Sequence, residues 1–344
     1  MGITPRIWSP RTPVAHLTMI LIIMQSAAMK KLSVGLSLAA AFALATTGCS
    51  SAPANPSASG SSTTKVTVLG EVYPLAWVAS QVGGDRVEVG QIVPAGAGAH
   101  GYELSPAQTD QIGKTGLVIY VESLAVSVDE AVAEAKPAAT IDLATVIPTR
   151  PAVAHDDAAE EAEHEATEEG HEASGIDAHM WLNPATMPKL VTAVSTQLGT
   201  LDPTGKATYE ANAAALNDKF TKLDAEYKAG LASCKEKTVI ITHPAFGYVT
   251  DQYGLTQVGI SGFDEDTEPS PARLAEVSKV AKGAGSSTIF FANTSSPKIA
   301  EVLAGELKLK TQVLSTLVAA KDGQDYLSLS AANLVALRDG LGCS

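Results

Sequence analysis

Short apolar runs alternate along most of the chain with longer segments whose apolar residues recur at helical spacing. The short runs are rich in Val and Ile and predict strands at 65–69, 87–93, 117–121, 238–242, 257–260, 288–291 and 312–314. The longer segments predict helices at 75–82, 105–112, 127–135, 245–253, 271–282, 297–307 and 326–341. Because strands that alternate with helices build mainly parallel sheets, the pattern predicts the α/β class.

A long segment between the two groups of strands breaks this alternation. Residues 184–233 are helical in tendency and rich in Ala, Leu and Lys. Within 209–231, apolar residues recur every three or four positions, as on one face of a helix: Leu216, Phe220, Leu223, Tyr227 and Leu231. We therefore expect two α/β lobes, 65–188 and 236–344, each with a mainly parallel sheet flanked by helices. One long connector helix within 189–235 would join them.

The acidic charge of the chain is concentrated in one place. The formal net charge is −13, and residues 155–172 hold nine carboxylates without a Lys or Arg. Like charges repel and offer little to bury, so we expect a surface loop without stable structure over 151–176. The acidic balance also argues against a nucleic-acid partner, because phosphate binding requires a basic face.

Residues 1–49 have the order of an export signal. Two lysines follow Met29, and an apolar stretch fills 32–45, which indicates that Met29 is the true start. A small residue and Cys49 then resemble a lipobox, although a threonine stands where a large aliphatic residue is usual. We expect a lipid on Cys49; an ordinary signal peptide or a buried cysteine is the alternative. The Ser-, Ala- and Pro-rich residues 50–64 predict a flexible tether.

Two further cysteines, Cys234 and Cys343, lie 109 positions apart. An exported chain meets an oxidising environment, which favours a disulfide between them. Two free buried thiols are the alternative.

The histidines fall into distinct settings. Three lie in the acidic segment: His155, His164 and His171. His100 and His243 follow predicted strands, and His179 lies close to the predicted connector. In a doubly wound lobe, ligands bind at the carboxyl ends of strands, so histidines of the two lobes would face each other across a cleft. Imidazole suits zinc. Solvated or hydrogen-bonded core histidines are the alternative.

Three sequence motifs then show a resemblance. Residues 100–106 (HGYELSP) resemble His-x-Tyr-Glu-x-x-Pro, and 177–184 (DAHMWLNP) resemble Asp-Pro-His-x-Trp-Leu-Asp-Pro with two departures. Residues 243–248 match His-Pro-Ala-Phe-Gly-Tyr without change. In this order the motifs resemble those of the zinc-type (cluster 9) solute-binding proteins of ABC transporters, and the resemblance extends over about 65–343.

The resemblance implies a set of site residues. His100, His179 and His243 would be the metal ligands. We interpret Glu103 as an acceptor that orients an imidazole; a solvated charge or a helix-capping contact is the alternative. The family usually adds an aspartate where Ser315 stands here. A hydroxyl is a poor zinc ligand, so the fourth position would be filled by water, by Asp322, or by one of the acidic residues at 264–266.

The resemblance also implies a function. The protein would capture Zn²⁺ outside the cytoplasmic membrane and deliver it to an ABC permease, as a lipid-anchored monomer and not as an enzyme. The three histidines of the acidic segment would bind zinc with low affinity; a solvated, charge-rich loop with incidental histidines is the alternative. A manganese or iron carrier of the same family and a zinc-dependent hydrolase are the alternatives, because three histidines with an open position also describe a catalytic zinc site.

Overall fold

The computed structural model describes residues 65–152, 175–262 and 268–344. Several residues named above lie outside these ranges: Cys49, His155, His164, His171 and the acidic residues at 264–266. The signal and tether, residues 1–64, and most of the acidic segment also lie outside them.

The N-terminal lobe contains a parallel four-stranded sheet with the order β2-β1-β3-β4. Its strands are β1 (Val66–Gly70), β2 (Val87–Gln91), β3 (Leu117–Tyr120) and β4 (Thr140–Asp142). Its helices are α1 (Tyr73–Gly83), α2 (Pro106–Lys114), α3 (Val126–Ala135) and α4 (Leu143–Val146). The sequence pattern did not predict β4 or α4, because three and four residues are too short to carry a periodic signal.

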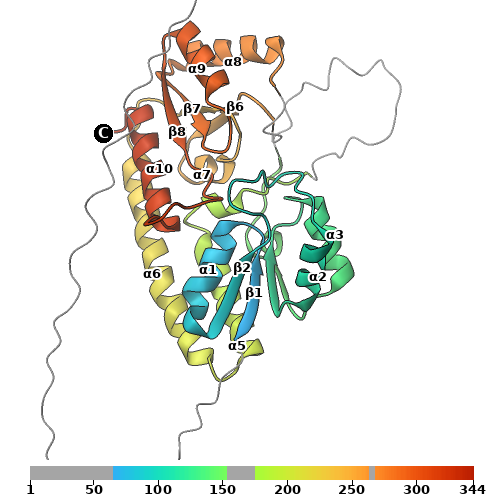
Figure 1. Ribbon diagram of the computed structural model, residues 1–344. Coiled ribbons are helices and arrows are strands. Elements are labelled where there is room, and N and C mark those ends of the chain that lie inside the picture. Colours follow the sequence, from blue (N-terminus) through green and yellow to red (C-terminus); the bar gives the residue numbers. More distant parts are fainter. Residues whose placement is uncertain (1–64, 153–174, 263–267) are drawn as a thin grey trace, which may run out of the picture. The chain divides into compact units, whose positions relative to one another are not determined.

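The C-terminal lobe repeats this architecture with the order β6-β5-β7-β8, again all parallel. Its strands are β5 (Thr238–Ile241), β6 (Thr256–Gly259), β7 (Thr288–Ala292) and β8 (Lys310–Leu314). Its helices are α7 (Gly247–Gln252), α8 (Pro271–Ala284), α9 (Lys298–Leu307) and α10 (Tyr326–Gly340). The prediction of two mainly parallel α/β lobes flanked by helices is therefore confirmed (Figure 1).

The segment between the lobes forms two helices, α5 (Met187–Leu201) and α6 (Lys206–Leu231). The chain turns between them at Asp202, whose carboxylate accepts hydrogen bonds from the backbone of Gly205 and from Arg86. α6 runs along both lobes and contacts α1 and α5 in the first and α10 in the second (Figure 1). All five apolar residues expected on its inner face are buried.

One hydrophobic core runs through both lobes along α6. It joins Trp77 of α1 to Phe220 of α6 and Tyr326 of α10, whose rings are in contact at centroid distances of 5.3–6.2 Å. Two smaller clusters fill the other faces of the sheets, one around Ile112 and Val118 and one around Ile240 and Ile289. The lobes are therefore joined by packed side chains and not by the chain alone.

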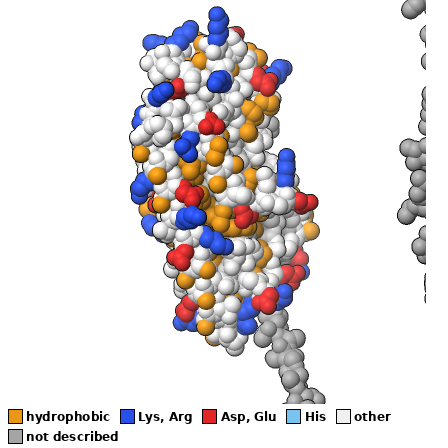
Figure 2. Space-filling view, turned by 90° about the vertical axis from the view of Figure 1, so that its left-hand side faces the viewer, with side chains coloured by type: hydrophobic (Ala, Val, Ile, Leu, Met, Phe, Trp, Pro, Cys, Tyr) orange, Lys and Arg blue, Asp and Glu red, His pale blue; other side chains and the backbone are white. Residues whose placement is uncertain are grey.

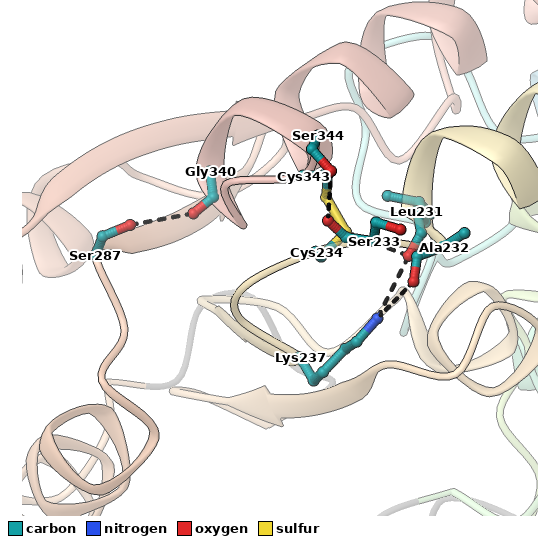
Figure 3. The surroundings of a disulfide bond; sticks show 9 residues. All are labelled: Leu231, Ala232, Ser233, Cys234, Lys237, Ser287, Gly340, Cys343 and Ser344. Carbon is teal, nitrogen blue, oxygen red and sulfur yellow. Dashed lines mark hydrogen bonds between the residues drawn. A yellow bond between two sulfur atoms is a disulfide. The ribbon is translucent and has the colours of Figure 1, made fainter.

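Cys234 and Cys343 form a disulfide in the structure. It joins the segment after α6 to the end of the chain after α10, and Ser344 N–H donates to the carbonyl of Ser233 beside it (Figure 3). Lys237 donates to the last carbonyls of α6, at Leu231 and Ala232. The bond thus attaches the last helix to the end of the connector.

The face formed by α6 and α10 carries Lys and Arg side chains interspersed with Asp and Glu (Figure 2). Across 65–152, 175–262 and 268–344, every helix is too short or too polar to cross a membrane.

Candidate metal centre

Three imidazoles from three separate parts of the chain meet at one point between the lobes. His100 lies in the loop between β2 and α2, and His243 lies two residues after β5, so both stand beyond the carboxyl ends of parallel strands. His179 directly precedes a single 3₁₀ turn, Met180–Leu182, that leads toward α5. This is the end of a doubly wound sheet at which ligands bind.

The ring nitrogens of this trio are close enough to share one ion. Nε2 of His179 lies 3.1 Å from Nε2 of His100 and 3.0 Å from Nε2 of His243. All three candidate ligand atoms lie within 4.8 Å of one another. Nitrogens bound at about 2.0–2.1 Å to a tetrahedral zinc lie roughly 3.3 Å apart, so the spacing fits such an ion.

Two of the three histidines are withdrawn from water. His179 and His243 are 2% and 1% exposed, whereas His100 is half-buried. Burial lowers the pKa of His243 well below its ordinary value, and the neighbouring His179 and His100 add to this effect, while a backbone hydrogen bond with Gly262 opposes it. His243 is therefore neutral at neutral pH, which is the form that ligates a metal.

A buried carboxylate orients His179. Oδ1 of Asp177 accepts hydrogen bonds from the backbone N–H of His179 at 3.0 Å and from its Nδ1 at 2.8 Å. Arg150 Nη1 donates to the other oxygen, Oδ2, at 2.7 Å. Burial alone would raise the pKa of Asp177, but the bonds from His179 and Arg150 outweigh it and hold that pKa below its ordinary value.

The tautomer of His179 follows from this contact. Because Asp177 can only accept, the proton of His179 lies on Nδ1, and Nε2 keeps a lone pair directed at His100 and His243. Metal-binding histidines in proteins commonly have a carboxylate in this position. The arrangement can therefore hold a divalent cation that prefers nitrogen.

The other residues expected at the site lie elsewhere or have other contacts. Glu103 and Asp322 are exposed. Ser315 Oγ accepts a hydrogen bond from the backbone of Leu317. Among the His, Cys, Asp and Glu residues of the described ranges, the cluster contains the three histidines only. The acidic residues at 264–266 lie outside these ranges.

Sequence reasoning did not single out Asp177 or Arg150. Asp177 could have been found, because a carboxylate two residues before a presumed ligand is well placed to orient it. Arg150 gave no local signal, because its partners lie 27 and 101 positions further along the chain.

Comparison with known proteins shows the family to which this chain belongs. The family model of the zinc-uptake complex component A, periplasmic (ZnuA), matches residues 68–340. The zinc-binding lipoprotein AdcA of Streptococcus pneumoniae strain R6 is 34% identical over 287 residues, which cover 80% of this chain and 55% of AdcA. The high-affinity zinc uptake system protein ZnuA of Bacillus subtilis strain 168 is 31% identical, with 80% of this chain and 88% of that protein covered.

The fold is also that of a solved zinc complex. The Zn(II)-bound ZnuA-like domain of Streptococcus pneumoniae AdcA superposes with a TM-score of 0.65 at 30% identity, and the match covers 80% of this chain and 99% of that domain. The chain spans only about half the length of the streptococcal relatives that it matches. The family model covers most of the chain, and the chain therefore belongs to the family of zinc-uptake complex component A.

Proposed function

We propose that this protein captures Zn²⁺ outside the cytoplasmic membrane and delivers it to the permease of an ABC importer. The observation that carries this proposal is the convergence of three imidazole nitrogens, from both lobes, on one point. Neutral imidazole suits zinc, whereas manganese prefers oxygen ligands, so a trio of nitrogens favours zinc. The relatives, a zinc-binding lipoprotein and a zinc uptake protein, support the same cargo.

Capture follows from the protonation and position of the ligands. His100, the more exposed of the three, meets the incoming ion, and His179 and His243 replace its remaining water with nitrogen. Because one core runs through both lobes along α6, the lobes do not separate widely when zinc leaves. Release therefore requires a local movement of the segments that carry the histidines.

The location and partners belong to the same proposal. A lipid on Cys49 would hold the protein at the outer face of the membrane, as a monomer beside its permease. Pro151 and Ile176 form an antiparallel bridge at the base of the acidic segment, next to Arg150 and Asp177. His155, His164 and His171 would thus belong to a segment that starts and ends beside the zinc site, where weak binding raises the local ion concentration.

Zinc affinity of substituted proteins tests this proposal. Competition with a fluorescent chelator should show one tight zinc site per chain, lost in His243→Ala and unchanged in His164→Ala, the control from the acidic segment. A zinc-loaded sample should not hydrolyse ester, peptide or phosphate substrates. Equal loss of affinity in the two variants would contradict the assignment of the site, and zinc-dependent turnover lost in His243→Ala would favour the hydrolase.

A further inference from the structure

Arg150 links the zinc site to the C-terminal lobe. Its Nη1 donates to Oδ2 of Asp177 at 2.7 Å, and its Nε donates to Oδ2 of Asp251, on α7, at 2.9 Å. Its backbone N–H donates to the hydroxyl of Tyr248, also on α7, at 3.0 Å. That hydroxyl in turn donates to the carbonyl of Asp177 at 2.8 Å. One residue of the N-terminal half thus contacts α7 and the carboxylate that orients His179.

The burial of these groups gives the link its strength. The side chain of Asp177 is fully buried and that of Arg150 is 17% exposed, whereas that of Asp251 is 60% exposed. A buried carboxylate is costly unless it is paired and hydrogen-bonded. The guanidinium meets this need and still reaches Asp251, because its planar group presents several donors in fixed directions. A lysine has one nitrogen and cannot occupy both donor positions.

The backbone of α7 leaves space for this guanidinium at Gly247. A Cβ atom at Gly247 would lie 1.6 Å from Nη1 of Arg150 and 2.8 Å from Oδ2 of Asp177. Any side chain there would force Arg150 away from Asp177. The first residue of α7 thus has to be a glycine for the link to form.

We propose that Arg150 is a positioning residue for zinc capture, which sets the orientation of His179 through Asp177 and makes that orientation depend on the contact with α7. The inference rests on the proposed function, because it concerns the same three-histidine site. A rearrangement of α7 that moved Arg150 would reach the ligand ring through two hydrogen bonds that Asp177 accepts, one from Arg150 and one from Nδ1 of His179.

A second arginine–aspartate pair provides a matched control. Arg86 donates to Oδ2 of Asp202 from Nε at 2.8 Å and from Nη2 at 2.6 Å, and both side chains are mostly buried. This pair lies beside the start of α6, at the amino end of β2, and it contacts none of the three histidines in any of its hydrogen bonds. Loss of this pair should lower the stability of the fold without changing the affinity for zinc.

The test compares Arg150→Lys and Gly247→Ala with Arg86→Lys, each in a protein that starts at Ser50. Zn²⁺ affinity is measured by chelator competition, and Co²⁺ is added as a probe whose visible spectrum reports the ligand geometry. We expect the first two variants to bind Zn²⁺ about tenfold to a hundredfold more weakly, the usual effect of losing an outer hydrogen-bond partner. Their Co²⁺ spectra should change. Arg86→Lys should melt at a lower temperature and keep the affinity and the spectrum of the wild type.

Asp251→Ala is a further variant in case Gly247→Ala does not fold, because Asp251 is exposed and its removal releases one side of the guanidinium. A smaller loss of affinity than in Arg150→Lys is expected. Wild-type affinity and spectra in Arg150→Lys and Asp251→Ala, together with tight binding lost in His243→Ala, would overturn this inference and leave the proposed function intact. A wild-type protein that fails to bind Zn²⁺ would overturn both.

Discussion

At the scale of single residues, metal binding depends on the orientation and the protonation of the histidines. Asp177 accepts from Nδ1 of His179 and so fixes the orientation of that ring, and burial lowers the pKa of His243, which favours the neutral imidazole. His243 therefore does not need to lose a proton when it binds a metal near neutral pH, which favours capture at low ion concentration.

Asp129 should make the stability of the fold depend on pH. Burial raises the pKa of Asp129 to about 6, a backbone bond from Ser123 opposes this, and the nearby carboxylates of Glu122, Asp142 and Glu130 add to it. The folded-state pKa exceeds the unfolded value of about 3.9, so the folded state binds the proton more tightly. This contribution to stability is complete below about pH 4 and is lost as the pH rises through 6.

Asp129→Asn removes that titration and keeps an oxygen that can accept from Ser123. Urea denaturation at pH 4 and pH 7 should show the wild type losing free energy of unfolding relative to the variant as the pH rises. A difference between the two proteins that does not change with pH would contradict the account.

The sequence singled out the three histidines that meet in the structure, but it did not single out all the residues that contact them. His100, His179 and His243 each stand in a motif of contiguous residues, and the order of those residues is sufficient to single them out. Arg150 has no such motif. Its role arises only when the fold brings it between Asp177 and Asp251.

At the scale of elements, the strands were predictable because Val- and Ile-rich runs are distinct from their surroundings. The break between α5 and α6 was not expected, although Asp202 and Pro203 are typical of a helix boundary. The helical spacing of the apolar residues continues on both sides of the turn, and this similarity concealed the break. β4 has three residues at the edge of its sheet and offers no period to detect.

The packing of α6 on α10 predicts a stability effect. Tyr227 of α6 is buried, and its hydroxyl donates to the carbonyl of Ser330 of α10 at 2.7 Å. Tyr227→Phe leaves this carbonyl without that donor and should lower the free energy of unfolding by about 1–3 kcal/mol. Thr221→Ala is the control on the same helix, because Thr221 is exposed and its hydroxyl donates to the carbonyl of Asn217 within α6. Denaturation curves that shift equally for both would refute the role given to this contact.

At the scale of the whole molecule, the sequence predicted two lobes and a connector but not how firmly they are joined. The division follows from the repeated alternation of strands and helices. The continuous core arises from side chains at distant positions, such as Trp77, Phe220 and Tyr326, whose contact depends on the tertiary arrangement.

The disulfide should contribute to stability and not to zinc binding. Cys234 and Cys343 close a loop with a sequence separation of 109. By the loop-entropy model, their replacement by serine should cost on the order of 4–5 kcal/mol of unfolding free energy. Denaturation by guanidinium chloride measures this cost. Chelator competition should show that the double serine variant binds zinc as tightly as the wild type. A large loss of zinc affinity in a folded double variant would contradict this separation of roles.

The central claim is that zinc binds between the lobes at His100, His179 and His243. Thermal melting tests it most directly, with a protein that starts at Ser50, after chelation and after addition of Zn²⁺, Mn²⁺ or Mg²⁺. A ligand at about a thousand times its dissociation constant adds roughly 4 kcal/mol of stability, which is a large shift. The account predicts a zinc-selective rise in melting temperature that survives deletion of 155–172 and disappears in His243→Ala. No rise, or a rise that is lost with 155–172, would contradict it.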